Sequence, residues 1–340
     1  MRKAGGEDDL LEGLVAGALG ARRARVLLGA VRVPEALAGP APSADRARIA
    51  FALALILLRD LLGRVPSARA YADDLAREGR PLVLDHGAVR TVLAPCGALP
   101  PGEEALTRIL RPLGFACAET YPLDRLAMTG RAWRHLDLPE DVPQYFVSEF
   151  HPEGFGAAFR GAAERVLASS ADPLPPRAAA LLERLGGEGR LAPAEAVSLL
   201  PDLAACFDRH HDAPALDDYR VLAEASPEMA WIATEGNAFN HATDRVPDVE
   251  ALAARQKALG RPMKDAVEVS ATGRVLQTAY RADAVERTFA TPEGAVVQRV
   301  PGSFFEFITR RPLPAGGLDL GFDTSNAQAI FRMTAAGEGR

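Results

Sequence analysis

Strand-like segments on both sides of a long helical block limit the possible folds of this chain more than any other feature. Residues 156–219 are rich in Ala, Leu and Arg and contain Pro between their helical stretches. Short β-branched and aromatic stretches bounded by turn residues precede this block within 82–150 and follow it within 274–311. Helices and strands that occur in separate runs are typical of the α+β class. We therefore expect an α+β fold with a helical insertion.

Helical periodicity predicts further helices outside this block. Residues 7–75 repeat apolar positions every three or four residues, with an interruption at Pro66. The most apolar run, residues 49–58, is half as long as the roughly 20 residues that a membrane-spanning helix needs, so we expect a buried helix there. The pattern also predicts helices at 103–115 and 248–260, a strand at 121–128, and a mostly extended or short helical segment at 228–240.

The composition restricts the partners and the cellular location. Of the 340 residues, 48% are hydrophobic and 25% are charged, a balance that supports a sizeable core and excludes a disordered or fibrous protein. Lys and Arg number 39 against 45 Asp and Glu, so the net charge of −6 gives no general attraction to nucleic acid or acidic membranes. The three cysteines form no CxxC pair, and the N-terminus has no secretory signal pattern. We therefore expect reduced thiols, a cytoplasmic location, and no nucleic-acid or membrane partner.

The first group of candidate functional residues lies in the segment DHGAVRT at residues 85–91. His86 and Arg90 share a face whether this segment is a strand or a helix. An imidazole can ligate a metal, and a guanidinium can hold a carboxylate through two parallel hydrogen bonds. The alternative is a buried structural histidine followed by a surface arginine.

A second candidate is His241, which follows Gly236, Asn237 and Asn240. Gly and Asn favour irregular backbone that is rich in hydrogen-bonding groups, so the sequence predicts a loop that presents this histidine to a cleft. The alternative is a solvated loop histidine without a chemical role.

The third candidate, Glu306, is the most informative residue of the chain. It lies in a predicted strand at 303–311, with Phe on either side in sequence and Phe304 and Ile308 on its own face. Burial of an unpaired carboxylate costs many kcal/mol, so a buried Glu306 requires a partner. A metal cation and an arginine both satisfy this requirement. The remaining alternative is an edge-strand glutamate that faces solvent.

Two histidines and one carboxylate are the ligand set of non-haem Fe(II) oxygenases, which leave open positions for substrate and O₂. The sequence separations of His86, His241 and Glu306 do not show whether the three segments are neighbours. A competing set has the HxD form of double-stranded-helix oxygenases, in which a second histidine and an arginine for the co-substrate lie further along the chain: His135, Asp137, His210 or His211, and Arg220.

Other chemistries have weaker support. Cys206 and His210 lie at helical spacing and are a further metal-binding possibility. The chain contains no GxSxG motif, no GxxxxGK[ST] motif and no GxGxxG motif. The sequence therefore does not indicate a serine hydrolase of that type or a nucleotide-binding protein.

Several segments, taken in order, resemble the 2-oxoadipate dioxygenase/decarboxylase family, a distant relative of the vicinal-oxygen-chelate enzymes. The segments are DHGAVRT, QYFVSEFHPEGF, GNAFNHATDRVPD, LQTAY and SFFEFITRR, and the resemblance covers about residues 45–335. It implies a vicinal-oxygen-chelate-like mixed or antiparallel sheet that cups a metal site. It further implies one catalytic domain over 1–340, made of N-terminal helices (1–78), a β-rich metal-binding core (80–150 and 228–335) and the helical insertion (155–222).

The resemblance also implies a reaction and its residues. The family reaction converts 2-oxoadipate and O₂ to D-2-hydroxyglutarate and CO₂ with Fe(II), a step of lysine breakdown, by decarboxylation and hydroxylation within one molecule. By motif, His86, His241 and Glu306 become the metal ligands and Arg90 the substrate-binding arginine. Further candidates for substrate contact are Ser325, Asn326 and Gln277. The partners would then be a small 2-oxo dicarboxylic acid and O₂.

Two alternatives to this function remain at the level of the sequence. One is another vicinal-oxygen-chelate metalloenzyme, an isomerase or lyase that uses Zn(II) or Mn(II) at the same residues. The other is a metal-free ligand-binding protein with the same fold.

Overall fold

The first quarter of the chain is helical, as the apolar periodicity predicts. The computed structural model describes residues 9–322, and its N-terminal helices are α1 (Leu10–Leu19), α2 (Ala21–Ala30), α3 (Arg46–Arg64) and α4 (Pro66–Arg77). The apolar run at 49–58 lies in α3, where apolar residues surround the helix and are buried on every side. The Asp45 carboxylate caps α3 by accepting a hydrogen bond from the Arg48 backbone N–H. Within residues 9–322, no helix combines the length and the apolar character needed to cross a bilayer.

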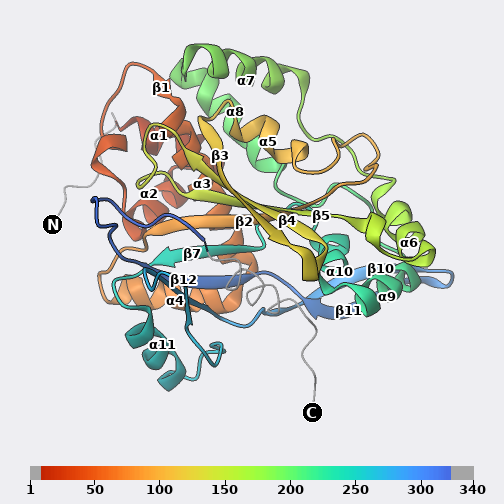
Figure 1. Ribbon diagram of the computed structural model, residues 1–340. Helices are drawn as coiled ribbons and strands as arrows, with labels where there is room; N and C mark the ends of the chain where they lie inside the picture. Colours follow the sequence, from red (N-terminus) through yellow and green to blue (C-terminus); the bar gives the residue numbers. More distant parts are fainter. Residues whose placement is uncertain (1–8, 323–340) are drawn as a thin grey trace.

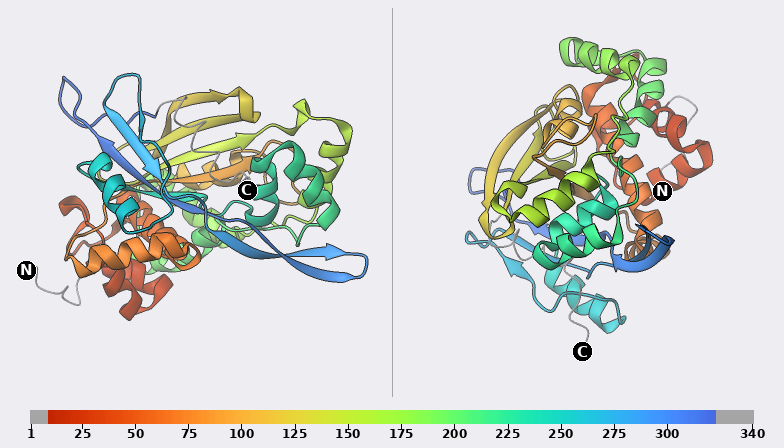
Figure 2. Two further views of the ribbon diagram at one scale, coloured as in Figure 1. Left: turned by 90° about the horizontal axis from the view of Figure 1, so that it is seen from below. Right: turned by 90° about the vertical axis from the view of Figure 1, so that its right-hand side faces the viewer.

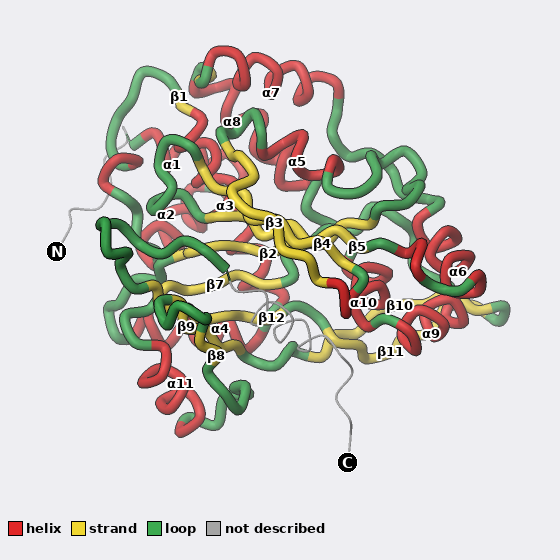
Figure 3. The backbone as a smooth tube through the Cα atoms, viewed as in Figure 1, coloured by secondary structure: helices red, strands yellow, loops and turns green. Residues whose placement is uncertain are grey.

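Eight strands of the described chain form one curled mixed sheet (Figures 1 and 3). In spatial order they are β3 (Phe115–Leu123), β4 (Met128–His135), β5 (Gln144–Phe150), β2 (Leu84–Val92), β7 (His241–Arg245), β12 (Phe304–Arg310), β9 (Val275–Ala279) and β8 (Glu268–Val269). The β2–β5 and β7–β12 pairs are parallel, and the other neighbours are antiparallel. Pairing of β2 with β7 joins the strands that precede the helical block to those that follow it. The α+β class and the vicinal-oxygen-chelate-like mixed sheet are confirmed.

The helices between β5 and β7 divide into two groups that pack in different places (Figures 1 and 2). Helices α7 (Pro176–Glu188) and α8 (Pro193–Ala205) pack together, and α8 also packs on α1 and α3. Helices α6 (Ala157–Leu167), α9 (Leu216–Ala225) and α10 (Pro227–Glu235) form the second group. A separate hairpin of β10 (Ala284–Thr291) and β11 (Gly294–Pro301) contacts α9 and extends beyond the sheet (Figure 2).

The remaining elements are short or isolated. The predicted helices at 103–115 and 248–260 correspond to α5 (Glu104–Leu110) and α11 (Val249–Ala258). β1 (Ala44–Asp45) pairs with β6 (Arg190–Leu191), and the 3₁₀ turns are η1 (Glu35–Leu37), η2 (Asp124–Leu126) and η3 (Pro152–Gly154).

One segment prediction is wrong. The strand predicted at 121–128 is the connection between two strands: it contains the end of β3, the turn η2 and the first residue of β4. Ala127 has a φ of 50° there. This left-handed conformation occurs in turns and is incompatible with a strand. For the segment at 228–240, predicted as mostly extended or short helical, the structure shows the short helix α10. Ser226 caps its N-terminus through the Met229 N–H, and Pro227 occupies the first turn.

Candidate metal centre

The strand register brings the three candidate ligands to one face of the sheet. His86 on β2 pairs with Thr243 on β7, and Thr243 pairs with Glu306 on β12. These three residues therefore form one row across the sheet. His241 precedes Thr243 by two residues on β7, so its side chain points to the same face. The convergence of His86, His241 and Glu306, which the sequence separations leave open and the family resemblance implies, is confirmed.

The prediction of irregular backbone around His241 is confirmed for the residues before it and wrong for His241 itself. Residues 236–240 form turns and bends, and Gly236 has a φ of 62°. His241 is the first residue of β7, and the backbone before it is already paired on both sides. The Asn240 N–H donates to the Ala88 carbonyl of β2, and the Asn240 carbonyl accepts from the Phe304 N–H of β12. The first residue of a strand, directly after an irregular segment, therefore presents this imidazole.

The ligand atoms lie close together in a buried position. The Nε2 atoms of His86 and His241 are each 3.2 Å from Oε2 of Glu306, and the three candidate donor atoms lie within 4.8 Å of one another. Glu306 is 0% exposed, His86 2% and His241 7%. Thr243 Oγ1 lies 3.0 Å from His86 Nε2 and donates to Glu306 Oε2 at 2.8 Å. Among the described residues, Oε1 of Glu306 has no hydrogen-bond partner.

Each imidazole has an oxygen acceptor on its other nitrogen. His86 Nδ1 is 2.8 Å from Oδ1 of Asp85, and His241 Nδ1 is 3.2 Å from Oδ1 of Asn240. When a metal ion is bound, a proton on Nδ1 would satisfy both contacts and leave the lone pair of Nε2 for the ion. Two nitrogen donors and one carboxylate on one face, with a buried carboxylate oxygen still unsatisfied, fit a divalent metal ion that keeps open coordination positions.

The electrostatics of the cluster keep the carboxylate ionised. Burial opposes ionisation of Glu306, but hydrogen bonds with His241 and His86 outweigh this effect and hold the pKa of Glu306 well below its usual range. Burial also lowers the pKa of His86, yet the contacts with Asp85 and Glu306 outweigh it and raise this pKa overall. Burial lowers the pKa of His241. The cluster is therefore an anionic acceptor flanked by two imidazoles.

Arg90 lies on the same face of β2, four residues after His86. It is 1% exposed, and its guanidinium carbon lies 4.9 Å from the ring centroid of Trp231. The side chain of Asn237 donates to the Arg90 carbonyl at 2.7 Å. Burial lowers the pKa of Arg90 to about 10, against the opposing charge of Glu228, so the guanidinium stays cationic at neutral pH.

Gln277 borders the opposite end of the cluster. It lies on β9 two residues before Ala279, the partner of Glu306, and pairs with Ile308. It is 2% exposed, and among the described residues its Oε1 has no hydrogen-bond partner. Ser325 and Asn326, the other candidates for substrate contact, lie outside the described residues.

A comparison with protein families matches residues 58–331 to the model described as 2-oxoadipate dioxygenase/decarboxylase. The chain belongs to this family. The match spans the helix α4, the whole curled sheet and the helical block, and it confirms the resemblance seen in the sequence motifs. Among curated proteins, no relative matches the chain.

Solved structures with a similar fold include a protein from Ralstonia eutropha JMP134 that is provisionally assigned to the glyoxalase superfamily. It is 55% identical, with a TM-score of 0.89, and the alignment covers 92% of this chain and 98% of that one. The hydroxyglutarate synthase of Oryza sativa in complex with 2-oxoadipate is 20% identical over 90% of this chain and 98% of its own, with a TM-score of 0.67. The corresponding complex from Pseudomonas putida is 20% identical over 86% and 74%, with a TM-score of 0.62. The last two show a shared fold.

The competing metal sites are wrong for this member of the family. Within residues 9–322, only His86, His241 and Glu306 form a group of three such residues close enough to hold a metal ion. His135 Nδ1 instead accepts the backbone N–H groups of Asp137 and Leu138, so it ends β4 as a structural cap. The carboxylate of Asp137 binds Arg46, and Arg220 pairs with Asp217.

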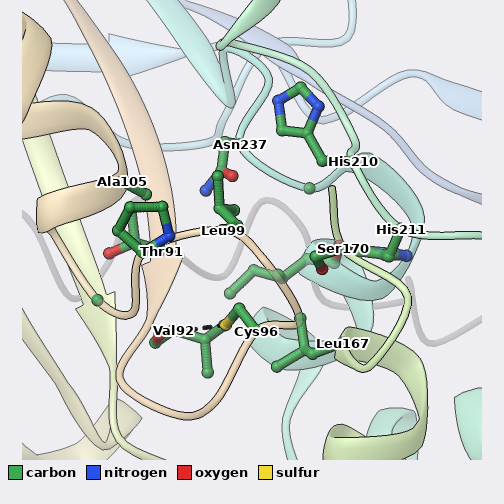
Figure 4. Close-up of a pocket in the computed structure, with 14 residues that line it drawn as sticks. Thr91, Val92, Cys96, Leu99, Ala105, Leu167, Ser170, His210, His211 and Asn237 are labelled. Atoms are coloured by element: carbon green, nitrogen blue, oxygen red, sulfur yellow. Dashed lines mark hydrogen bonds between the residues drawn. The ribbon is translucent and has the colours of Figure 1, made fainter. Parts of the chain in front are cut away.

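The distal histidines of the competing sets line a separate cavity of about 20 Å³ near the end of β2 (Figure 4). His210, His211, Thr91 and Asn237 are among its lining residues. This volume holds one water molecule and excludes a six-carbon acid. Cys206 Sγ donates to the Asp202 carbonyl rather than facing a metal position.

Sequence reasoning missed several residues that complete the site. Thr243 bridges His86 and Glu306, yet a threonine in a strand carries no motif. The sequence places Asn240 in a segment of irregular backbone, but only the contact with Nδ1 of His241 shows its role. Phe322 packs edge-on against His86, with ring centroids 4.9 Å apart, and its N–H donates to the Tyr121 hydroxyl.

Proposed function

We propose that this protein is an Fe(II)-dependent dioxygenase/decarboxylase that converts 2-oxoadipate and O₂ to D-2-hydroxyglutarate and CO₂. The atoms balance without an additional oxidant. C1 of the substrate leaves as CO₂, and both oxygen atoms of O₂ enter hydroxyglutarate, one in its new carboxylate and one in its hydroxyl group. The observation that carries the proposal is the buried carboxylate of Glu306, which lies between two Nε2 atoms and has one unsatisfied oxygen. Membership of the 2-oxoadipate dioxygenase/decarboxylase family supports the reaction class.

His86, His241 and Glu306 would hold the metal on one face. Fe(II), when bound, supplies a redox-active Lewis acid at which the 2-oxo acid and O₂ can react. The protein's own contribution is to fix its ligands and to limit access of water. Phe304 packs against the His241 ring at 4.6 Å between centroids, and Phe322 covers His86. These aromatic contacts cover part of each imidazole ring.

Arg90 would hold the remote carboxylate of the substrate. Four residues separate Arg90 from His86 on β2, a span of about 13 Å at 3.3 Å per residue. The intervening Ala88 shares the face and occupies little space. A dicarboxylic acid can therefore place one end at the metal cluster and extend the other toward the guanidinium. Charge-assisted hydrogen bonds at this distant point orient the reacting end of the acid.

The decisive experiment measures O₂ uptake by the purified protein with Fe²⁺ and 2-oxoadipate. We expect one O₂ consumed per CO₂ released, with chiral chromatography identifying D-2-hydroxyglutarate. A monocarboxylic 2-oxo acid of equal length serves as the matched substrate control, since it cannot use Arg90. Absence of 2-oxoadipate-dependent O₂ uptake by the iron-loaded protein would refute the proposal.

A second candidate function follows from the 55% identical relative, which is provisionally assigned to the glyoxalase superfamily. The same three ligands could hold Zn(II) or Mn(II) for an isomerase or lyase reaction. Such a reaction consumes no O₂, so turnover without O₂ uptake would favour it. A metal-free binding protein is distinguished by metal analysis after anaerobic reconstitution, because it would retain no stoichiometric metal.

A further inference from the structure

We infer that Asp85 and Arg310 are positioning residues that hold the imidazole of His86 in its metal-binding orientation. The inference rests on the metal site proposed above. It assigns a role to the buried ion pair of Asp85 and Arg310, which contacts the candidate metal ligand His86. Neither residue of the pair is proposed to contact the reacting groups. Three observations carry it: a bulge in β2, the geometry of the Arg310 guanidinium, and the charge of the pair.

The bulge brings two consecutive side chains together. Asp244 and Thr243 are neighbours on β7, whereas their partners on β2 are Leu84 and His86, so Asp85 is an extra residue in the ladder. Side chains of consecutive residues in a regular strand point to opposite faces. Bulges re-aim side chains in this way, often beside active sites. Here the Asp85 carboxylate reaches the neighbouring ring, with its Oδ1 2.8 Å from Nδ1.

The guanidinium of Arg310 holds this carboxylate in place. Arg310 follows Glu306 by four residues on β12, so both side chains share a face. Its Nε donates to Oδ1 and Oδ2 of Asp85 at 3.0 and 2.9 Å, and its Nη2 donates to Oδ1 at 2.9 Å. Its Nη1 donates to the carbonyls of Asp319 and Gly321, at 2.8 Å each. All three nitrogens have acceptors, so the carboxylate cannot turn away from the imidazole without breaking several bonds.

The charge of the pair explains why an arginine is needed. The side chains of Asp85 and Arg310 are 2% and 0% exposed, and an unpaired carboxylate in that position would be a second buried negative charge near Glu306. Arg310 neutralises it. The partner of His241 is the neutral amide of Asn240, so neither support changes the net charge of the donor set. Both imidazoles are thus held through Nδ1 while the site keeps one net negative charge.

Removal of such a support weakens metal binding by about 10- to 100-fold in other proteins. The test titrates the metal-free protein with Co²⁺ and follows its visible absorption, alongside thermal unfolding of the apoprotein. We expect Asp85→Asn and Arg310→Lys each to weaken Co²⁺ binding by about 10- to 100-fold. Lysine keeps the charge but offers no planar fork, so it cannot hold both carboxylate oxygens.

Arg287→Lys is the matched control. Arg287 forms a similar fork with the buried Glu235, through contacts of 2.6 and 2.7 Å, and neither residue contacts the candidate ligands. We expect this variant to lower the unfolding temperature and to bind Co²⁺ within about twofold of the wild type. The double variant Asp85→Asn/Arg310→Gln removes both charges and leaves no unpaired ion, so it separates positioning from folding. We expect it to be folded and still weak in Co²⁺ binding.

The outcomes separate this inference from the proposed function. Wild-type affinity and spectrum in folded Asp85→Asn, Arg310→Lys and the double variant would overturn the inference while leaving the metal site intact. Recovery of wild-type affinity in the double variant alone would show that the pair only stabilises the fold, and would also overturn it. A wild-type protein that binds no Co²⁺ would refute the metal site itself and, with it, the inference.

Discussion

Asp244 provides a test of the reasoning that is independent of catalysis. It lies on β7 next to Thr243, is 3% exposed, and accepts hydrogen bonds from the Tyr71 hydroxyl at 2.6 Å and the Val83 N–H at 2.8 Å. Burial raises its pKa from 3.8 to about 6, although these two hydrogen bonds act in the opposite direction. The perturbation is Asp244→Asn, which keeps the shape and removes the ionisation.

The sign of the effect follows from proton binding. Between pH 3.8 and about 6 the folded protein binds a proton on Asp244 that the unfolded chain has released. The contribution to stability is therefore fully present below pH 3.8 and is lost as the pH rises through 6. The shift of roughly two units corresponds to about 3 kcal/mol. We expect the free energy of unfolding of Asp244→Asn, relative to the wild type, to rise by about 2.5 kcal/mol between pH 4 and pH 8.

Urea unfolding of both proteins at several pH values measures this difference. Other groups titrate in both proteins alike, so their contributions cancel in the comparison. Tyr71→Phe is a useful companion, because it removes a hydrogen bond that lowers the Asp244 pKa and should move the transition to higher pH. A difference between wild type and Asp244→Asn that does not change with pH would refute the assignment of a buried, partly protonated carboxyl.

Three further predictions concern the metal site and the strand that carries it. Glu306→Gln should weaken Co²⁺ binding by more than about 100-fold, beyond the loss typical of supporting residues, as measured by the same titration. Arg90→Ala should raise the KM for 2-oxoadipate by about 10- to 150-fold, the equivalent of one lost hydrogen bond to a charged group, and change kcat less; an unchanged KM would contradict its role. Gly87→Ala should destabilise the protein by about 1–3 kcal/mol in urea, because the new Cβ would lie 2.4 Å from the Phe239 ring. Gly13→Ala, which meets open space in α1, is the matched control and should stabilise by about 0.5–1 kcal/mol.

The sequence predicted the parts of the fold that local patterns encode. The buried helix at 49–58 and the strands around His86 and Glu306 follow from hydrophobic periodicity and β-branched or aromatic runs. Glu306 stood out because a carboxylate in an apolar strand demands a partner. Convergence of the three ligands rested on the family resemblance, because it depends on the parallel pairing of β7 with β12, which links residues distant in the chain.

The supporting residues could not be predicted, because their roles depend on register. The Asp85 side chain would point away from His86 in a regular strand, and only the bulge against β7 reverses this. Arg310 lies near the end of its strand and looks like a surface cation, yet its side chain is fully buried. The prediction for His241 itself fails for a related reason. Gly and Asn correctly indicate the irregular segment at 236–240, but pairing with two neighbouring strands begins at Asn240 and places His241 in β7.

Packing on the opposite face of β12 determines whether Glu306 reaches the histidines at all. Phe305 and Phe307 alternate with Glu306 and pack against Tyr71 of α4, with ring centroids 5.7 and 4.8 Å apart. Because side chains alternate along a strand, a slip of one residue would turn Glu306 toward Tyr71 and direct the phenylalanines onto the imidazoles. That slip would forfeit about 1.5–3 kcal/mol for each phenylalanine that left the core, and it would bury the carboxylate without its partners. The position of the carboxylate is therefore set by apolar contacts that lie on the other side of the sheet from the metal site.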